Sequence, residues 1–436
     1  MEKFKLNIAD KELSVEINDL AEQAAGSCFV RYGDTVVLAT AVMAKTTREG
    51  VDFFPLTVEY EERFYAAGKI LGSRFVRRES RPSDEAIITA RAIDRTIRPR
   101  FPETFRNEVQ VVITCLSWDG ENDPDIIGIL GASVALGISN IPWTSPIAPI
   151  RIGKANDKFI INPTYEERKE GKLDMVLVGL QENNTPLINM IEMEGDEVQE
   201  NTVIEAYDLA KPHLKNLIDF QNEIIKKVGK KKADIAEPPI NRDLEKEFKD
   251  FLGDKLEKGL FLVKKADREN ALEELENNLA YFIEGKFPGL GKTKNIKGFF
   301  EKEINRLVHE NAIQKGRRAD GRKLDEIREI KTEAGILPRT HGSGLFIRGE
   351  TKALSILTLG TPSDVRLMEG MEIRGKKRFM HHYNFPPYSS GEVKPMRGPG
   401  RREIGHGMLA EKALLPLVPS FEEFPYTMRV VTEILS

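Results

Sequence analysis

The chain has 436 residues, which is enough for about three domains at roughly 150 residues each. Hydrophobic residues make up 40% and charged residues 31% of the sequence, and these ordinary proportions exclude a disordered, collagen-like or disulfide-scaffold protein. Lys and Arg number 65 against 69 Asp and Glu, so the formal net charge is −4. The molecule as a whole therefore has no net positive charge that would attract a nucleic acid, and any basic surface must be local.

No segment has the composition of a secretory signal or of a membrane span. The first 15 residues alternate polar and apolar side chains, whereas a signal peptide needs an uninterrupted apolar stretch. The most apolar run, Ile126–Ile138, has 13 residues, and a span needs about 20. Its small residues predict a buried, closely packed helix instead. Cys28 and Cys115 lie in apolar runs, which favours reduced thiols. We therefore expect a cytoplasmic protein that does not contact membranes.

The first part of the chain alternates strand patterns with helix patterns. Apolar residues at every second position predict strands over 4–8 and 13–17, and β-branched residues predict a strand pair over 29–42 with a turn at Gly33-Asp34. A helix is predicted over Asp84–Ile97, with Ser83 as its N-cap and Pro99 as its stop. Further strands and helices are predicted at Val109–Leu116, Ile126–Ser139, Phe159–Asn162 and Met175–Leu180. This mixture predicts an α+β fold.

From about Val198 the sequence becomes rich in Glu and Lys and has helical periodicity. The basic stretch Lys226–Lys232, followed by Pro238-Pro239, is typical of a domain boundary, and a solvated linker explains the same residues. We predict a first α+β core domain at 1–230, a helical domain at 236–316 and a second core domain at 317–436. The helices are predicted at Val203–Val228, Arg242–Leu256, Asn270–Glu284 and Phe299–Asn311.

The chain also repeats itself, which predicts a duplicated α+β domain around a helical insert. Gly26-Ser27 and Gly33-Asp34-Thr35 match Gly342-Ser343 and Gly349-Glu350-Thr351 at an offset of 316. The segment Arg77-Arg78-Glu79 matches Arg401-Arg402-Glu403 at an offset of 324, which places eight extra residues in the second copy. After this second match only one more strand is predicted, so we expect the second copy to be incomplete.

An arginine cluster precedes and enters the predicted helix of the first copy. The stretch 74–106 holds nine Arg, no Lys and five acidic residues. A guanidinium can bind a phosphate with two parallel hydrogen bonds, so clusters made only of Arg indicate phosphate recognition. Phe75, Arg77, Arg78 and Arg81 precede the helix, where a loop could present them to a nucleic-acid backbone. Arg91, Arg95 and Arg98 lie inside the helix, and pairing with its acidic residues is the alternative for them: Asp84, Glu85 and Asp94.

A second basic stretch, 366–402, combines nine basic residues with three acids. Aromatic residues and histidines are interleaved with these charges, a pattern that suits single-stranded RNA because bases stack on rings and phosphates pair with cations. A mobile charged loop is the alternative. At its end, Arg401, Arg402 and His406 lie in the overlapping glycine-rich run Gly398–Gly407, where a histidine can act as proton donor or phosphate ligand. The interleaved residues include Phe379, His381, His382, Tyr383, Phe385 and Tyr388.

The sequence resembles bacterial polynucleotide phosphorylases over essentially its whole length. Three motifs in each copy carry the resemblance. The first copy supplies Phe75-Val76-Arg77-Arg78-Glu79 with Arg81-Pro82-Ser83, the helix motif Ala90-Arg91-Ala92-Ile93-Asp94-Arg95, and Asn122-Asp123-Pro124-Asp125. The second copy supplies Arg318-Ala319-Asp320-Gly321-Arg322, His382-Tyr383-Asn384-Phe385-Pro386-Pro387-Tyr388-Ser389 and Arg401-Arg402-Glu403-Ile404-Gly405-His406-Gly407.

This resemblance implies two ribonuclease-PH-like domains joined by an all-helical domain, in a homotrimer with single-stranded RNA in its central channel. It implies 3′ to 5′ phosphorolysis of RNA, reversible, with inorganic phosphate as co-substrate and nucleoside diphosphates as products. By motif, Arg77, Arg78 and Arg81 would grip RNA, while Arg401, Arg402 and His406 would line the active site. RNA contacts are also expected from Phe75, His382, Tyr383 and Phe385.

The sequence departs from the family pattern in one respect. The family's serine-rich phosphate-binding turn, its Asp-rich magnesium segment and its KH and S1 domains have no match here. We therefore expect no metal ligands in this chain, with the Mg²⁺ of the complete enzyme held elsewhere, and we expect the chain alone to be inactive. Two readings stay open: a part of a phosphorolytic exoribonuclease, or a non-catalytic RNA-binding or assembly fragment.

Overall fold

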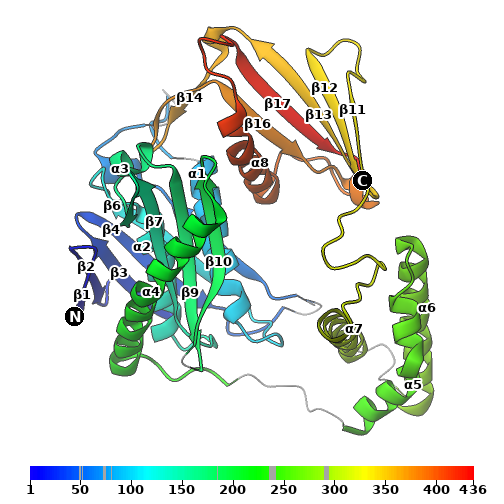
Figure 1. The fold of residues 1–436 in the computed structure, drawn as a ribbon. Helices are drawn as coiled ribbons and strands as arrows, with labels where there is room; N and C mark the ends of the chain where they lie inside the picture. Colours follow the sequence, from blue (N-terminus) through cyan, green and yellow to red (C-terminus); the bar gives the residue numbers. More distant parts are fainter. Residues whose placement is uncertain are drawn as a thin grey trace. The chain divides into compact units, whose positions relative to one another are not determined.

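The computed structural model describes residues 1–48, 51, 53–71, 75–79, 81–183, 185–234, 242–288 and 294–436. The chain forms two compact units (Figure 1). One unit combines Met1–Ile235 with Lys331–Ser436, and the other is Ala236–Ile330. The predicted boundary at Pro238-Pro239 lies outside the described residues, and the domain limits inside the first unit stay a prediction.

The first copy begins with a six-stranded sheet in the order β1-β2-β3-β4-β6-β5. Neighbouring strands are antiparallel, except that β5 and β6 are parallel. The predicted turn is confirmed, because Gly33 has a φ of +61° between β3 and β4. The strands are β1 (Glu2–Ile8), β2 (Lys11–Ile17), β3 (Gly26–Tyr32), β4 (Thr35–Met43), β5 (Leu56–Glu61) and β6 (Val109–Ser117).

The buried helix α2 (Pro124–Ile138) packs between this sheet and a second, four-stranded one, as Figure 1 shows. Small residues make this close packing possible: a Cβ on Gly26 would lie 2.1 Å from the Ala135 carbonyl oxygen. The helix predicted from the apolar run is therefore confirmed. The second sheet has the order β10-β9-β7-β8 and is covered by α4. These elements are β7 (Ile147–Ala155), β8 (Lys158–Ile161), α3 (Tyr165–Lys169), β9 (Leu173–Glu182), β10 (Thr185–Gly195) and α4 (Glu200–Val228).

The helix α1 (Asp84–Ile97) packs against β5 at the edge of the first sheet. Its predicted N-cap is confirmed: the Ser83 side chain accepts a hydrogen bond from the Ala86 backbone N–H at 2.9 Å. The predicted stop at Pro99 is also confirmed, because α1 passes there into the 3-10 helix η2 (Arg98–Arg100). The buried face of α1 includes Ile93 and Ile97, which are both inaccessible to solvent.

The second compact unit is helical, as the Glu- and Lys-rich periodicity predicts. Its helices bury a small apolar core in which Leu279 and Ile283 are fully covered. The predicted helix over Val203–Val228 lies in α4 and so belongs to the other unit, where it packs on β7 and β9. The helices of this unit are α5 (Arg242–Leu260), α6 (Lys265–Lys286) and α7 (Lys294–Lys315).

The second copy repeats the topology of the first, so the predicted duplication is confirmed. Its sheet has the order β11-β12-β13-β17-β16, which corresponds strand for strand to β2-β3-β4-β6-β5. The pair β16 and β17 is parallel, as β5 and β6 are. Helix α8 (Arg401–Leu414) packs on β16 as α1 packs on β5. The strands are β11 (Ile330–Ala334), β12 (Gly342–Arg348), β13 (Thr351–Gly360), β16 (Phe379–Asn384) and β17 (Thr427–Ile434).

This correspondence corrects the predicted alignment of the two copies. Arg401 is the first residue of α8, whereas Arg77 and Arg78 lie in the loop before α1. The two helices have equal lengths and coincide at an offset of 317, so the match at 324 and its eight extra residues are wrong. Strands β5 and β16 coincide at 323. Compared with the first copy, the second copy therefore has additional residues before β16 and a shorter loop before α8. These two differences in length place two unrelated Arg-Arg-Glu segments at similar distances along the two copies.

The residues gained before β16 form a hairpin that ties the two copies together. Its strands are β14 (Arg366–Glu369) and β15 (Arg374–Lys377). Met371 at its tip is fully buried in the hydrophobic core of the first copy. The Lys69 ammonium donates to the Met371 carbonyl oxygen at 2.6 Å, and the Tyr165 hydroxyl donates to the Glu372 carboxylate.

The hairpin tip brings two carboxyl groups close together in a buried place. Burial and the nearby Asp123 charge raise the pKa of Asp125 at the start of α2 to about 7. Burial and the Asp125 charge raise the pKa of Glu372 well above its usual value. Tyr165, Glu62 and Arg151 are the other titratable groups whose charges or hydrogen bonds act on this pair. Protonation of the pair therefore helps to hold the hairpin in place.

We expect the unit that contains both copies to lose stability as the pH rises through 7. The native state binds the Asp125 proton more tightly than the unfolded chain does, so the free energy of unfolding should fall by about 1.4 kcal/mol between about pH 6 and about pH 8. Urea denaturation at a series of pH values measures this. Asp125→Asn should flatten the dependence, and Glu22→Gln, on an exposed turn, should leave it intact. An equal slope in all three proteins would contradict the prediction.

Candidate phosphate and RNA site

Strand β16 and helix α8 place the predicted site residues of the second copy. Phe379 and His381 lie on the buried face of β16, whereas His382 on the opposite face and Tyr383 near the strand end are partly exposed. Helix α8 can lie close to this strand because Gly407 has no side chain: a Cβ there would lie 3.3 Å from the His381 carbonyl oxygen. The glycine-rich run thus brings the start of α8 beside the end of β16.

Four side chains gather where these two elements meet: Tyr383, Phe385, Arg402 and His406, which we call the aromatic–arginine cluster. The Arg402 guanidinium lies over the Phe385 ring, 5.2 Å from its centroid. The Tyr383 ring stacks on Phe385 with centroids 6.4 Å apart, and it meets the His406 ring edge-on at 5.2 Å. Rings that stack and a guanidinium that binds anions are the groups that single-stranded RNA needs.

The electrostatics of this cluster favour an anion. Within the described ranges, no carboxylate forms an ion pair with Arg402. Partial burial lowers the pKa of His406, and the charges of Arg402 and Arg91 lower it further. The imidazole is therefore largely neutral at pH 7, with one nitrogen free to accept a proton and the other to donate one.

Arg401, the neighbour of Arg402, points elsewhere. Its Nη1 donates to the Val58 carbonyl oxygen at 2.8 Å, and its Nη2 forms an ion pair with the Glu59 carboxylate, both on β5 of the first copy. Its positive charge is thus compensated. The structure brings Arg402 and His406 together, as predicted, but it separates Arg401 from them.

The two predicted histidines of β16 also take structural roles. The ring of His381, predicted only as a residue interleaved with the basic stretch, is buried and bonded on both nitrogens, to the Gly407 carbonyl oxygen at 3.2 Å and the Thr432 hydroxyl at 3.0 Å. His382, predicted to contact RNA, accepts a hydrogen bond from Arg429 Nε at 3.1 Å through its Nδ1. Tyr383 and Phe385 are therefore the residues of this strand end that lie in the cluster.

The predicted RNA-gripping loop of the first copy is exposed. Phe75 has 93% of its surface accessible, and Arg77, Arg78 and Arg81 are exposed as well. Arg77 has a φ of +53°, a left-handed conformation that turns the chain sharply here. Among the described residues, no hydrogen bond, ion pair or ring contact joins this loop to the aromatic–arginine cluster, and residues 72–74 and 80 of the same stretch lie outside the described residues.

The corrected alignment reveals the counterpart of the cluster in the first copy, and its charge is reversed. At an offset of 317, Asp84, Glu85 and Thr89 of α1 take the places of Arg401, Arg402 and His406. They line a cleft together with further carboxylates, among them Asp125 and Glu372. The same cleft is also lined by the basic residues Arg151, Arg168, Arg366 and Lys412, and Asp84 pairs with Arg366 at 2.7 Å. Its charges are therefore mixed, and the reversal of sign is confined to equivalent positions of the two helices.

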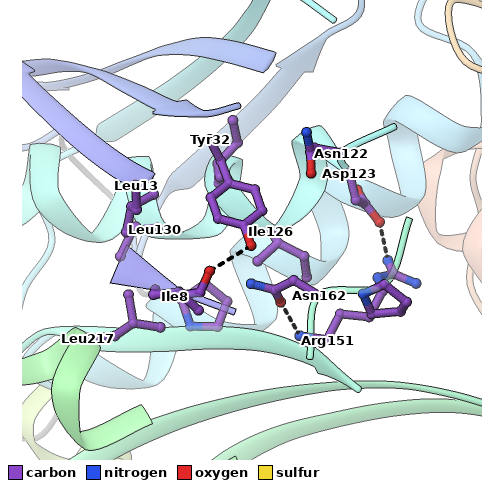
Figure 2. A pocket seen from close by; sticks show the side chains of 13 residues that line it. Ile8, Leu13, Tyr32, Asn122, Asp123, Ile126, Leu130, Arg151, Asn162 and Leu217 are labelled. Carbon is purple, nitrogen blue, oxygen red and sulfur yellow. Dashed lines mark hydrogen bonds and ion pairs between the residues drawn. The ribbon is translucent and has the colours of Figure 1, made fainter. Parts of the chain in front are cut away.

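A smaller enclosed pocket of the first copy has a structural role. Figure 2 shows its largely apolar wall, formed where α2 faces β7. Its polar groups bond to one another: the Tyr32 hydroxyl donates to the Ile8 carbonyl oxygen at 3.0 Å, and Arg151 pairs with Asp123 at 2.6 Å. Arg151 also pairs with Asp174 at 2.8 Å. These bonds hold the second sheet onto α2 and offer a substrate little to bind.

The residues around the cluster do not fit the magnesium ion that the family resemblance implies. Mg²⁺ prefers about six oxygen ligands, usually including carboxylates. The nearest carboxylate along α8 is Glu403, which is already engaged in accepting a hydrogen bond from the Gly400 backbone N–H at 3.0 Å. Across the part of the chain that the structure describes, no three His, Cys, Asp or Glu side chains form a group suited to a metal. We therefore derive no chemical step through a metal.

The chain is similar in sequence to curated proteins of several bacteria. Polyribonucleotide nucleotidyltransferases of Heliobacterium modesticaldum and Syntrophomonas wolfei are each 46% identical to it, over 99% and 100% of this chain. The enzyme of Thermotoga maritima is 47% identical over 100% of this chain. The chain spans 60% of the first of these relatives and 61% of the other two. In the described part of the chain, the helices are all too short or too polar to cross a membrane.

Family models agree with the fold. The model of the 3′ exoribonuclease family, domain 1, matches residues 10–142 and 326–436. These residues contain β2 to β6 of the six-stranded sheet and the whole five-stranded sheet. The model of domain 2 of the same family matches residues 145–212, which contain the second sheet of the first copy. The fold class expected from the repeat is therefore confirmed, and the chain belongs to the 3′ exoribonuclease family, with a duplicated ribonuclease-PH-like domain and a helical insert.

Proposed function

We propose that this chain is part of a polyribonucleotide nucleotidyltransferase that degrades single-stranded RNA from its 3′ end by phosphorolysis. The observation that carries the proposal is the identity of 46% to enzymes of that name across the whole chain. The aromatic–arginine cluster supports it, because stacked rings and a guanidinium without a carboxylate partner lie beside a histidine.

In this reaction an oxygen of inorganic phosphate forms a bond to the phosphorus of the last phosphodiester. The bond between that phosphorus and the 3′ oxygen of the preceding ribose breaks, and a nucleoside diphosphate leaves. The freed 3′ oxygen takes up the proton that the phosphate brings. The same steps run backwards to extend RNA from nucleoside diphosphates.

Each residue of the cluster can contribute to this reaction. Arg402 would hold a phosphate oxygen, because a fixed guanidinium lowers the repulsion between the attacking phosphate and the phosphodiester. Tyr383 and Phe385 would stack with bases near the 3′ end. His406 would donate a hydrogen bond to a phosphate oxygen through one ring nitrogen. The exposed residues Arg77 and Arg78 would hold the RNA backbone farther from the reacting bond.

The complete enzyme supplies what this chain does not. We propose that its Mg²⁺ is bound outside the described residues, that it assembles as a homotrimer and that it acts in the cytoplasm, as the family resemblance implies. A non-catalytic RNA-binding fragment is the second candidate. The observation that favours it is the lack of a group of metal-binding carboxylates among the described residues.

We expect Arg402→Gln to abolish most phosphorolysis in the complete enzyme, by about 100-fold, because one fixed donor to the transition state is lost. Release of nucleoside diphosphates from a single-stranded RNA with phosphate and magnesium measures this. Lys352→Gln, which removes an exposed charge of the same copy, is the control. The same assay on this chain alone decides between the candidates: RNA binding without release supports the binding fragment, and release supports the enzyme.

We expect the double variant Arg77→Gln with Arg78→Gln to bind single-stranded RNA more weakly, because two phosphate contacts are lost. The slope of the logarithm of the binding constant against the logarithm of salt concentration should fall by about 1.4 in magnitude. Fluorescence anisotropy of a labelled oligonucleotide measures it. Arg48→Gln, which removes a guanidinium paired with Glu108, should leave the slope unchanged. An unchanged slope in the double variant would remove this loop from the RNA path.

A further inference from the structure

The buried residue His381 joins three elements of the second copy. Its Nδ1 lies 3.2 Å from the Gly407 carbonyl oxygen of α8, and its Nε2 lies 3.0 Å from the Thr432 hydroxyl of β17. The His381 backbone N–H also donates to the carboxylate of Glu411, one helical turn beyond Gly407, at 3.0 Å. Bonds at two successive turns fix the position of α8 along β16 and its rotation about its own axis.

The chemistry of these partners determines where the proton of the His381 ring lies. A carbonyl oxygen can only accept a hydrogen bond, so Nδ1 carries the proton and donates to Gly407. Burial lowers the pKa of His381, and the neutral ring therefore offers Nε2 as an acceptor to the Thr432 hydroxyl. The Thr432 oxygen then accepts from the Ser355 hydroxyl of β13 at 2.8 Å. We call these three side chains the serine–threonine–histidine network: Ser355, Thr432 and His381.

The first copy has apolar side chains where the second copy has this network. The equivalent residues, given by the cross-strand pairing in the two sheets, are Ala39 for Ser355, Ile113 for Thr432 and Val58 for His381. All three are buried, with at most 3% of their surface exposed. The same arrangement of strands therefore packs without polar groups at these positions, and the network is a feature of the copy that carries the aromatic–arginine cluster.

The network adjoins the cluster directly. Gly407 follows His406 in α8, and Tyr383 comes two positions after His381 in β16. A Cβ on Gly407 would lie 3.5 Å from the Tyr383 backbone nitrogen, so the helix and the strand touch at this point. The His406 ring meets the Tyr383 ring edge-on with centroids 5.2 Å apart. A shift of α8 relative to β16 would therefore change the contact between the two rings.

We propose that His381 is a positioning residue of the aromatic–arginine cluster. Through the serine–threonine–histidine network it holds α8 on β16, so that His406 keeps its contact with Tyr383. Arg402, one turn earlier in the same helix, is held in place with it. The effect on the geometry of the cluster is independent of the proposed function, whereas the effect on phosphorolysis rests on it.

The test replaces the network by the residues of the first copy, in a triple variant with His381→Val, Thr432→Ile and Ser355→Ala. Removing the polar side chains together leaves none of them buried without a partner, so the melting temperature should stay close to that of the unmodified chain. His381→Asn is the conservative variant, because an asparagine amide can donate from about the place of Nδ1. His309→Gln, which changes an exposed histidine of α7, is the control.

Three readouts are used. NMR of the full chain, with its six histidines isotopically labelled, shows which nitrogen of His381 carries the proton. The same spectra give the chemical shifts of the His406 ring protons, which depend on the contact with Tyr383. The third readout is the release of nucleoside diphosphates from single-stranded RNA by the complete enzyme, analysed as kcat and KM. Thermal melting confirms that each variant is folded.

We expect the triple variant to shift the His406 ring protons and to lower kcat about tenfold, because Arg402 and His406 are then poorly aligned with the reacting groups. KM for RNA should stay within about twofold, since uniform binding of RNA along its backbone does not depend on this alignment. His381→Asn should retain most of kcat and the His406 shifts. His309→Gln should match the unmodified protein in every readout.

The outcomes separate this inference from the proposed function. A folded triple variant with unchanged His406 shifts and kcat would overturn the inference, because the network would then serve the core alone. A proton on Nε2 of His381 in the unmodified chain, or His381→Asn behaving like the triple variant, would also overturn it. If the triple variant does not fold, His381→Val alone takes its place. If the complete enzyme releases no nucleoside diphosphates, the proposed function fails, while the His406 shifts still decide the inference.

Discussion

The ion pair between Arg401 and Glu59 is the interaction on which the site depends. It fixes the first turn of α8 to β5 of the first copy, and the Val58 carbonyl oxygen adds a second bond to the same guanidinium. Successive side chains of a helix point in different directions, so the next residue, Arg402, is directed away from β5 and lies over the Phe385 ring. One arginine is used to hold the helix so that its neighbour stays available to a ligand.

The two copies carry side chains of opposite charge at equivalent positions of the same fold. Their sheets have the same strand order and the same parallel edge pair, and their helices start at equivalent points. The first turns of the two helices carry opposite charges at equivalent positions, where Asp84 and Glu85 correspond to Arg401 and Arg402. A hairpin from the second copy packs on the first copy, with Met371 in its core. The first copy therefore supports the second, in which Arg402 lies over the Phe385 ring.

Much of this architecture could be predicted from the sequence, because local patterns determine it. The alternation along β3 and β4, the Ser83 cap and the small residues of α2 all led to elements that the structure contains. Two features could not be predicted. The true register of the copies depends on loop lengths, and a repeated Arg-Arg-Glu was more conspicuous than the helix starts. Whether Arg91, Arg95 or Arg401 forms an ion pair depends on which acidic residues lie nearby in space, such as Glu59 and Glu192.

The buried tip of the hairpin has a consequence for the order in which the protein is made. Lys69 and Met371 are 302 positions apart, yet they are bonded, and Met371 fills the core of the first copy. During synthesis on the ribosome, the core of the first copy is therefore completed only by Met371, which is synthesised long after the last strand of that copy. The helical unit between them can form in that interval from contacts within itself. The contacts of Met371 would therefore form late, because they join distant parts of the chain.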